Sequence, residues 1–311
     1  MKIREFKKGL NETYLLVKKI EEKKTKPGDL YLSMELTDGE SNIVAKQWST
    51  SLIDTMAKQS IIVYVSIEVG TYNNMPDYTI RQLRPASDTE GISYSQFIKS
   101  APIEPNTMYQ AIVSDISSID NDDMKRLTLN ILENNKSNLL KWSAAKMIHH
   151  NMRGGLLYHM YRMVRSVGDW QKTYPLANRD LLICGATLHD IGKLIELITN
   201  DLGDAEYTTN GMLFGHLLIG ADMVKEAGEK LNTDPEVIRT LRHIIISHHG
   251  TLEHEAIKTP CMFEAEIIHY FDMLDSRSYQ YEQLIATTEP GEFTSEKVFG
   301  LNNQRIYIQN L

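Results

Sequence analysis

All ten histidines of this 311-residue chain lie after residue 148. They occupy positions 149, 150, 159, 189, 216, 243, 248, 249, 254 and 269. An even spread would place many of them in the first half of the chain, and imidazole is a common ligand of transition metals. The distribution therefore predicts a histidine-free N-terminal part and a separate C-terminal part that carries a metal site.

The N-terminal part has the pattern of a small β-barrel. Short runs rich in β-branched and aromatic residues predict strands at residues 12–20, 29–36, 43–48, 61–69 and 78–83. A short helix is expected at Ser51–Lys58, between the third and fourth strands. Three strands, a helix and two strands form the element order of an OB-fold, a common platform for single-stranded nucleic acid. We therefore predict a five-stranded OB-like barrel in residues 1–90.

The charge of this part argues against a broad basic surface. Residues 1–90 hold 13 Lys+Arg and 13 Asp+Glu, so the net charge of -8 belongs to residues 91–311. Nucleic-acid-binding proteins more usually show a basic stripe. A local surface for stacking and phosphate contact could still be made by Tyr31, Lys46, Trp48, Tyr72, Tyr78, Arg81 and Arg84. The alternative is that the aromatic members only pack the barrel.

Residues 91–147 are expected to form a helical connector. Ser93–Ser100 is expected to be a short helix, Pro102 and Pro105 interrupt the chain, and Asp123–Lys146 has mixed apolar and polar spacing. Exposed apolar surface on these helices could support a homo-oligomer.

The pair His189-Asp190 is the strongest single signal for chemistry. It follows the apolar run Leu181–Ala186 and begins the sequence His-Asp-Ile-Gly-Lys. One imidazole and one carboxylate form the mixed ligand set that Mn, Fe, Co or Zn accepts. A carboxylate at the end of a buried helix is costly unless a cation or hydrogen bonds compensate it. The pair therefore predicts two ligands of a metal site.

Ligand-type side chains also lie on the apolar stripes of four other predicted helices. They are His159, His216, His248 with His249 about one helical step further round, and Asp272. His216, for example, shares its stripe with Met212, Ile219 and Met223. A single histidine of this kind is more often a hydrogen-bonded core residue. Several on successive helices predict a metal site between helices.

The order of these residues resembles a known family. The set His159, His189-Asp190, His216, His248-His249 and Asp272 resembles the HD-domain metal-dependent phosphohydrolases. With the OB-like part in front of it, the chain is similar to the YhaM-type 3′-5′ exoribonucleases over nearly its whole length. The resemblance implies an all-α HD domain in residues 148–290, followed by a C-terminal tail in residues 291–311.

The resemblance also implies a set of site residues. One divalent metal would be surrounded by His159, His189, Asp190 and Asp272, and a second by His216, His248 and His249 with Asp190 shared. Mn is the first candidate, with Fe, Co or Zn as alternatives, and the number of ions is one or two.

The roles of three further residues, Lys193, His249 and His150, stay open. Lys193, one turn beyond His189, would meet a substrate phosphate as a catalytic residue beside Asp190, and the alternative is a solvated lysine at a helix end. Whether His249 or His150 is a ligand stays open.

The implied activity is a cytoplasmic, metal-dependent 3′-5′ exoribonuclease. It would hydrolyse the phosphodiester bonds of single-stranded RNA with a metal-activated water, and single-stranded DNA is a second candidate substrate. Two other functions remain open: an HD phosphohydrolase of mononucleotides or signalling nucleotides, and a nucleic-acid-binding protein without catalysis.

The remaining features of the sequence agree with a cytoplasmic protein. Cys184 and Cys261 are expected to be reduced, buried thiols. The N-terminal residues contain no apolar signal segment, and no uncharged run approaches the ~20 residues of a membrane span. We therefore expect no membrane association.

Overall fold

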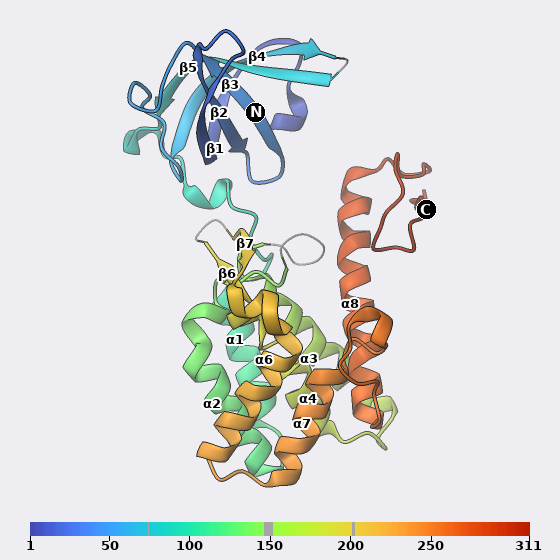
Figure 1. Cartoon of the computed structure of the whole chain (residues 1–311). Helices are drawn as coiled ribbons and strands as arrows, with labels where there is room; N and C mark the ends of the chain where they lie inside the picture. Colours follow the sequence, from blue (N-terminus) through green and yellow to red (C-terminus); the bar gives the residue numbers. More distant parts are fainter. Residues whose placement is uncertain (74, 146–151, 201–202) are drawn as a thin grey trace. The chain divides into compact units, whose positions relative to one another are not determined.

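The computed structural model describes residues 1–73, 75–145, 152–200 and 203–311. It divides the chain into two compact units, Met1–Lys99 and Ser100–Leu311. The first unit contains a closed β-barrel and the second is built mainly from helices (Figure 1). The prediction of an OB-like five-stranded barrel followed by a helical domain is confirmed.

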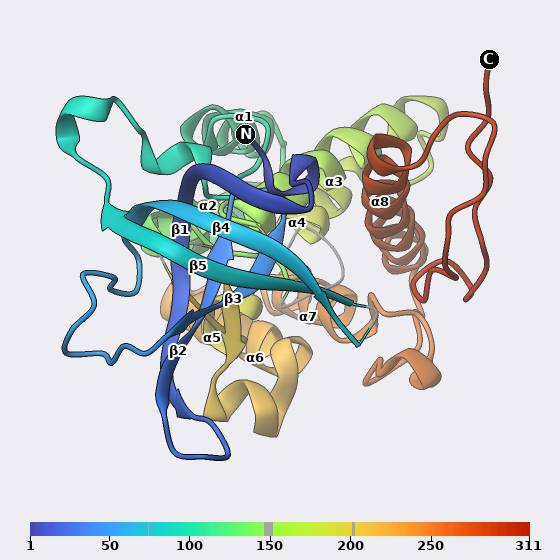
Figure 2. The same cartoon turned by 90° about the horizontal axis from the view of Figure 1, so that it is seen from above.

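In the described part of the first unit, five strands form the barrel. They are β1 (Gly9–Lys24), β2 (Leu30–Thr37), β3 (Asn42–Trp48), β4 (Ile62–Tyr72) and β5 (Met75–Pro85). The strands hydrogen-bond in the order β1-β2-β3-β5-β4 and the barrel closes between β4 and β1 (Figure 2). Among these five strands, β3 and β5 pair in parallel and the other neighbours are antiparallel. Closure of the barrel removes the open sheet edges through which strands aggregate.

The first strand serves two neighbours. The N-terminal half of β1 pairs with β4 and its C-terminal half pairs with β2, and Leu16 is in register with both Thr37 and Ile62. A register shift between Val17 and Lys19 accompanies the change of partner.

Alternating side chains fill the barrel. Leu32, Met34 and Leu36 on β2 are fully buried together with Leu15 and Val17 on β1. The strand predicted at residues 29–36 is thus confirmed, and its buried side chains follow the period of two residues of a β-strand. Each fully buried side chain of this size contributes roughly 1.5–3 kcal/mol of hydrophobic free energy.

The helix expected at Ser51–Lys58 is wrong. The segment forms turns, with its single local backbone bond running from the Thr55 N–H to the Ser51 carbonyl. Leu52, Ile53 and Met56 are exposed, Ile53 to 95%. An eight-residue helix is marginal by itself, and of the segment's apolar side chains Ala57 alone packs into the barrel core.

The second unit begins with two helices before the first histidine. Its helices are α1 (Pro105–Ser117), α2 (Asp122–Leu139), α3 (Gly155–Thr173), α4 (Arg179–Leu188), α5 (Lys193–Glu196), α6 (Thr209–Lys230), α7 (Pro235–Ser247) and α8 (Phe263–Thr287). A two-stranded sheet, β6 (Leu197–Thr199) with β7 (Ala205–Tyr207), interrupts them. Short 3-10 turns lie at Ile3–Glu5, Asp88–Glu90 and Tyr94–Gln96 in the first unit and at Leu252–His254 in the second. No described helix is long and apolar enough to cross a membrane.

The segment expected as a connector differs from its prediction in two places. The helix predicted at Ser93–Ser100 is only a 3-10 turn. Pro105, interpreted as an interruption, is the first residue of α1, a position where its missing N–H costs nothing. The buried faces of α1 and α2 pack into the same hydrophobic core as α3, α4 and α7.

Helix α4 lies at the centre of this core. Its residues Leu181–Leu188 are all buried, which is the pattern of a helix surrounded by other helices. The Asn178 side chain accepts a hydrogen bond from the Leu181 N–H and caps the start of the helix. The C-terminal end of α4 carries His189 and Asp190 into the interior.

The two cysteines differ from the expectation that both are buried. Cys184 is fully buried on α4, and burial raises the pKa of its thiol to about 12. Cys261 is exposed.

We expect a thiol reagent such as DTNB to modify Cys261 in the folded protein and Cys184 only after denaturation, because the reaction needs both a thiolate and access to it.

Counting the modified thiols spectroscopically before and after addition of guanidinium chloride checks this expectation. The Cys261→Ser variant is the control and should show no rapid reaction while folded. A second fast-reacting thiol in the wild-type protein would contradict the burial of Cys184.

Candidate metal centre and barrel surface

Five separate helix regions bring the predicted ligands together. Helix α3 supplies His159, the end of α4 supplies His189 and Asp190, α6 supplies His216, the end of α7 supplies His248 and His249, and α8 supplies Asp272. Their side chains form three overlapping groups in which all potential ligand atoms lie within 4.8 Å of one another.

The two carboxylate oxygens of Asp190 face different histidines. Its Oδ2 lies 3.6 Å from the Nε2 atoms of both His159 and His189. Its Oδ1 lies 3.5 Å from His216 Nε2 and 3.6 Å from His248 Nε2. These distances exceed those of hydrogen bonds. Asp190 thus stands between two groups of ring nitrogens, which is the position of a shared ligand.

All five histidines direct Nε2 toward this centre, because their Nδ1 atoms are held elsewhere. His189 Nδ1 donates to the Ala186 carbonyl and His248 Nδ1 to the Ile245 carbonyl, at 2.9 and 2.8 Å. The Nδ1 of His249 donates to the His254 carbonyl at 2.9 Å.

The other two rings are oriented by carboxylates. His159 Nδ1 bonds to Asp275 Oδ2 at 2.7 Å and His216 Nδ1 to Glu196 Oε1 at 3.0 Å. A donor at Nδ1 fixes the tautomer in which Nε2 offers its lone pair, the usual arrangement of metal-binding histidines.

His159, His189 and Asp272 lie together on one side of Asp190, and we call them the first group. The Nε2 atoms of His159 and His189 are 3.0 Å apart, and Asp272 Oδ1 lies 3.2 Å from His159 Nε2. Two nitrogens bound to one ion at about 2.1 Å in a tetrahedral site are separated by about 3.4 Å, close to the separations of these atoms. The spacing of these atoms fits a common ion.

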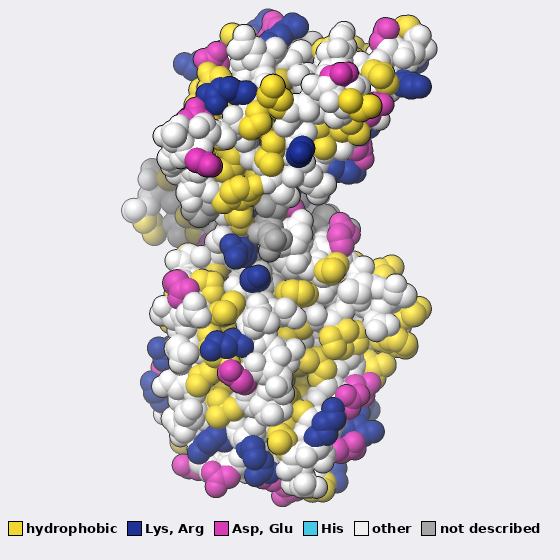
Figure 3. All heavy atoms as spheres, turned by 90° about the vertical axis from the view of Figure 1, so that its left-hand side faces the viewer, with side chains coloured by type: hydrophobic (Ala, Val, Ile, Leu, Met, Phe, Trp, Pro, Cys, Tyr) yellow, Lys and Arg dark blue, Asp and Glu magenta, His cyan; other side chains and the backbone are white. Residues whose placement is uncertain are grey.

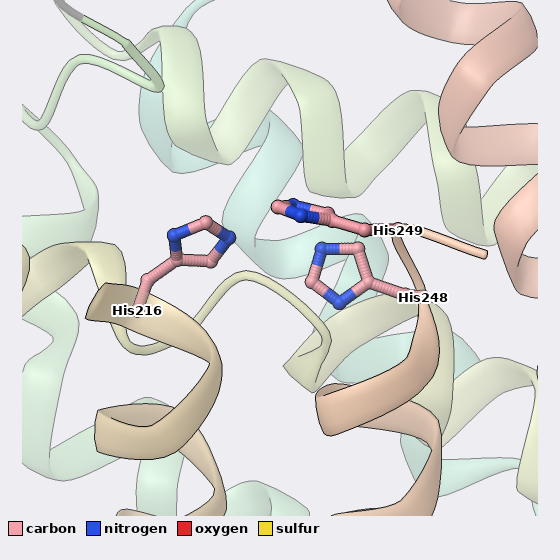
Figure 4. Close-up of side chains that lie close together, drawn as sticks. All are labelled: His216, His248 and His249. Atoms are coloured by element: carbon pink, nitrogen blue, oxygen red, sulfur yellow. The ribbon is translucent and has the colours of Figure 1, made fainter. Parts of the chain in front are cut away.

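The second group contains His216, His248 and His249. Figure 4 shows His216 approaching from α6 and facing the other two rings, which come from the end of α7. The ring of His249 lies 5.1 Å from that of His216 and 4.6 Å from that of His248, measured between centroids. His249 therefore lies with its two neighbours, which favours its interpretation as a ligand.

The electrostatics of the centre favour a cation. Burial alone would raise the pKa of Asp190, but Lys193 and the surrounding imidazoles hold that pKa well below its usual range. Burial lowers the pKa of His189 to about 4. The C-terminal ends of α4 and α7 also point their negative dipole ends at the centre.

Protons compete for one of the ligand positions. Burial lowers the pKa of His159, but hydrogen bonds to Asp272 and Asp275 outweigh it and raise the pKa to about 10. A cation bound at Nε2 must displace that proton.

Two buried atoms of the centre have no hydrogen-bond partner among the described residues. They are Asp190 Oδ1 and His216 Nε2. Leaving a buried acceptor unsatisfied costs about 1–3 kcal/mol, and more for a charged group. Both atoms are natural ligands of a divalent cation and lie 3.5 Å apart, so the donor set fits such an ion on the His216 side of Asp190.

Lys193 is buried rather than solvated. Its side chain is 9% exposed, and its Nζ donates to Asp190 Oδ2 at 2.7 Å. Burial lowers the pKa of Lys193, but the Asp190 charge outweighs it and raises the pKa above its usual value. The lysine is therefore a fixed positive charge beside the shared carboxylate, and it also lines a pocket of about 500 Å³ with His216 and His249.

Glu196 was not predicted to belong to the site. Its Oε1 accepts hydrogen bonds from both the backbone N–H and the Nδ1 of His216, each at 3.0 Å. Asp275, which was not among the predicted ligands, orients His159 in the same way and also pairs with Arg162. The placement of a carboxylate one turn after Asp272 was the available signal for Asp275.

The stripe predicted for His216 is wrong at its N-terminal end. Gly215 interrupts α6 with φ 65° and ψ 159°, a conformation essentially restricted to glycine. Met212, before this kink, is 74% exposed instead of buried. The kink also frees the His216 N–H from the helix ladder, and Glu196 accepts that bond.

Gly192, in the His-Asp-Ile-Gly-Lys sequence, allows a close backbone contact. A Cβ atom at this position would lie 2.1 Å from the His216 carbonyl oxygen and 2.7 Å from the Gly220 nitrogen. Only glycine therefore lets the chain after Asp190 pack directly on α6. His150, left open as a ligand, lies outside the described residues.

Four of the predicted barrel residues lie together. Tyr31 and Trp48 are paired across β2 and β3 with ring centroids 4.9 Å apart. Lys46 Nζ lies 5.7 Å from the Trp48 ring and 6.0 Å from the Tyr72 ring. Trp48 and Tyr72 are 43% and 67% exposed, so both rings are available for stacking.

The other barrel candidates have different partners. Arg81 donates to Glu68 at 2.6 Å, and Arg84 bonds to Glu90. Tyr78 packs against the barrel core, as the alternative reading held. Lys46 itself donates to Asp77 at 2.7 Å. On the face of the barrel shown in Figure 3, Lys and Arg side chains are scattered among acidic and apolar ones.

Comparison with known proteins identifies the family. The HD domain model matches residues 156–285. The 3′-5′ exoribonuclease YhaM of Listeria innocua is 34% identical over 95% of this chain and 94% of its own length. The chain belongs to the YhaM family. The YhaM exoribonuclease of Bacillus subtilis is also 34% identical over 95% of the chain.

Solved structures add little for this YhaM family member. The second OB-fold domain of replication protein A from Methanococcus maripaludis covers 27% of the chain at 21% identity, with a TM-score of 0.23. The OB-like assignment of the barrel rests on its own closed strand order instead.

Removing the partner of His216 should weaken metal binding. We expect Glu196→Ala to lower the affinity of the YhaM family member for Mn²⁺ by about 10- to 100-fold, since such partners fix ligand orientation. Glu196→Gln keeps an acceptor oxygen and should lose less. Isothermal titration calorimetry measures the affinity, with Glu226→Ala, an exposed position on α6, as the control. Wild-type affinity in a folded Glu196→Ala variant would rule out this positioning role.

Proposed function

We propose that this protein is a metal-dependent 3′-5′ exoribonuclease that removes nucleotides from single-stranded RNA in the cytoplasm. The observation that supports this most strongly is the placement of Asp190 between two groups of Nε2 atoms. Membership of the YhaM family agrees with it. Single-stranded DNA is a second substrate within the proposal.

In this proposal the parts of the chain have separate tasks. Residues 1–90 would hold the strand, residues 148–290 would carry out hydrolysis and residues 291–311 would form a tail. Residues 91–147 would link the first two parts, with α1 and α2 packed into the core of the helical unit. The surface of Tyr31, Lys46, Trp48 and Tyr72 supports the first task, because stacking on aromatic rings holds single strands without base preference. Stacking also suits a barrel whose charges balance.

Two divalent ions, with Mn²⁺ as the first candidate, are the cofactors of the proposal. His159, His189, Asp190 and Asp272 would hold one, and His216, His248, His249 and Asp190 the other. When bound, such ions neutralise phosphate charge and lower the pKa of water.

The protein's own groups complete the site. Asp190 is kept ionised by Lys193, and the Nδ1 bonds of the histidines keep their lone pairs directed inward. Lys193 contributes a buried positive charge at the pocket where a phosphate would enter. Burial removes competing water and strengthens these charge interactions.

Replacing the shared carboxylate tests the proposal directly. With a 5′-labelled single-stranded RNA and Mn²⁺, we expect the wild-type protein to produce a ladder shortened from the 3′ end. Asp190→Asn should lose this activity by several orders of magnitude, because both groups lose a ligand. Asp222→Asn, an exposed carboxylate on α6, is the matched control and should behave as wild type.

The Asp190→Asn variant must be shown to fold, because Lys193 would lose its buried, charged partner. Thermal unfolding provides that check. A folded Asp190→Asn variant with full activity would refute the site. Hydrolysis of free nucleotides without any RNA ladder would favour the other class of HD phosphohydrolase.

Trp48 tests the task of the barrel. We expect Trp48→Ala to weaken binding of single-stranded RNA by about 5- to 150-fold, corresponding to about 1–3 kcal/mol for one stacked base. Fluorescence anisotropy with a labelled RNA and a chelator measures the affinity. Ile53→Ala removes a side chain that is 95% exposed on the same unit and should leave the affinity unchanged. Equal affinities of the two variants would mean that Trp48 does not stack on the strand.

A further inference from the structure

The pocket beside the second ligand group has two chemically different parts. His216, His249 and Lys193 line it where it meets the candidate metal centre. Tyr207 and Phe214 also line it, and these rings are 49% and 54% exposed. Its volume of about 500 Å³ falls in the range of pockets that hold one small ligand. The pocket lies wholly within the helical unit.

The two aromatic residues are attached to the backbone that positions His216. Tyr207 ends β7 and pairs with Leu197, the residue after Glu196, and the Thr208 N–H donates to the Glu196 carbonyl at 2.9 Å. Phe214 directly precedes the Gly215 kink, after which the chain directs His216 inward. Both rings are therefore held at a defined place relative to the candidate ligands.

Glu255 adds an acidic side chain to the same pocket. Its φ of 69° is in the left-handed region, which is unfavourable for a glutamate and persists only where surrounding structure holds it. The structure, over the residues it describes, gives its carboxylate no hydrogen bond or ion pair. A carboxylate of this kind accepts hydrogen bonds from ribose hydroxyls. It also repels an additional phosphate.

We propose that this pocket is the subsite for the 3′-terminal nucleoside of the substrate. Its base stacks on Tyr207 and Phe214, its ribose hydroxyls face Glu255, and the phosphate on its 5′ side reaches the metal ligands. The proposal rests on the proposed exoribonuclease function. It has two consequences: stacking tolerates every base, and the end that is accepted carries a free 3′-hydroxyl.

An RNA that lacks the base of its 3′-terminal nucleotide tests whether the base stacks on Tyr207 and Phe214. The substrates are two 5′-labelled RNAs of identical sequence, one with an abasic 3′-terminal nucleotide. We expect the wild-type protein to remove the base-bearing nucleotide about 5- to 150-fold faster than the abasic one. In the Tyr207→Ala/Phe214→Ala variant this ratio should fall to near one. Tyr207→Phe should preserve it, since the ring remains.

Leu213→Ala is the matched control for this experiment. Leu213 is 68% exposed beside Phe214 and does not line the pocket, so its truncation should leave the ratio as in wild type. Equal wild-type rates on both RNAs, or a ratio kept by the double variant, would overturn the subsite while leaving the exoribonuclease function intact. Failure of the wild-type protein to shorten either RNA would instead count against the proposed function.

A binding measurement tests the subsite without turnover. An RNA with 2-aminopurine at its 3′ end is added to the full-length protein in the presence of a chelator. We expect the fluorescence to be quenched by the wild-type protein and by Leu213→Ala, but not by the double variant. Equal quenching by all three proteins would overturn the stacking.

The position of Glu255 beside the ribose is tested by comparing RNAs that end in a 3′-hydroxyl or a 3′-phosphate. We expect wild type to degrade a 3′-hydroxyl RNA at least about tenfold faster than the same RNA with a 3′-phosphate, because Glu255 repels the second charge. Glu255→Gln should reduce this preference several-fold, whereas Glu253→Gln, a nearby exposed glutamate, should not. An unchanged preference in Glu255→Gln would remove Glu255 from the subsite.

Discussion

The burial of the Asp190 carboxylate constrains the whole helical unit. The residue is 1% exposed, and an ionised carboxylate out of water carries a penalty of several kcal/mol unless positive groups surround it. Lys193 supplies one such group, and histidines of α3, α6 and α7 lie around both oxygens. The packing of these helices around α4 is therefore also the assembly of the candidate centre.

Two of the candidate ligands arise from one local motif that occurs twice. His189 and His248 each follow the last residue of a helix, and each donates its Nδ1–H to the carbonyl three residues earlier. The ring satisfies a carbonyl that the helix end leaves without a partner. The same hydrogen bond thus caps the helix and orients the ring. It depends only on the end of the helix and on no distant residue.

The sequence predicted those parts of the molecule that depend on short-range patterns. Alternation in β2 and the His-Asp pair after a fully apolar run indicated the barrel core and the centre. The role of Glu196 was not predicted, because its partner His216 is 20 residues away and no periodicity relates them. The helix at 51–58 failed because local propensity cannot reveal that no surface covers it. The exposure of Met212 depended on one glycine dihedral angle.

The double pairing of β1 has a consequence for synthesis of the protein. During synthesis β1 precedes both of its partners, and it can pair with β2 before β4, some fifty residues later, has been made. Until then the half of β1 from Gly9 to Leu16 exposes an unpaired edge. Closure of the barrel is consequently a non-local, late step of its folding, whereas the helices that follow can begin from local contacts.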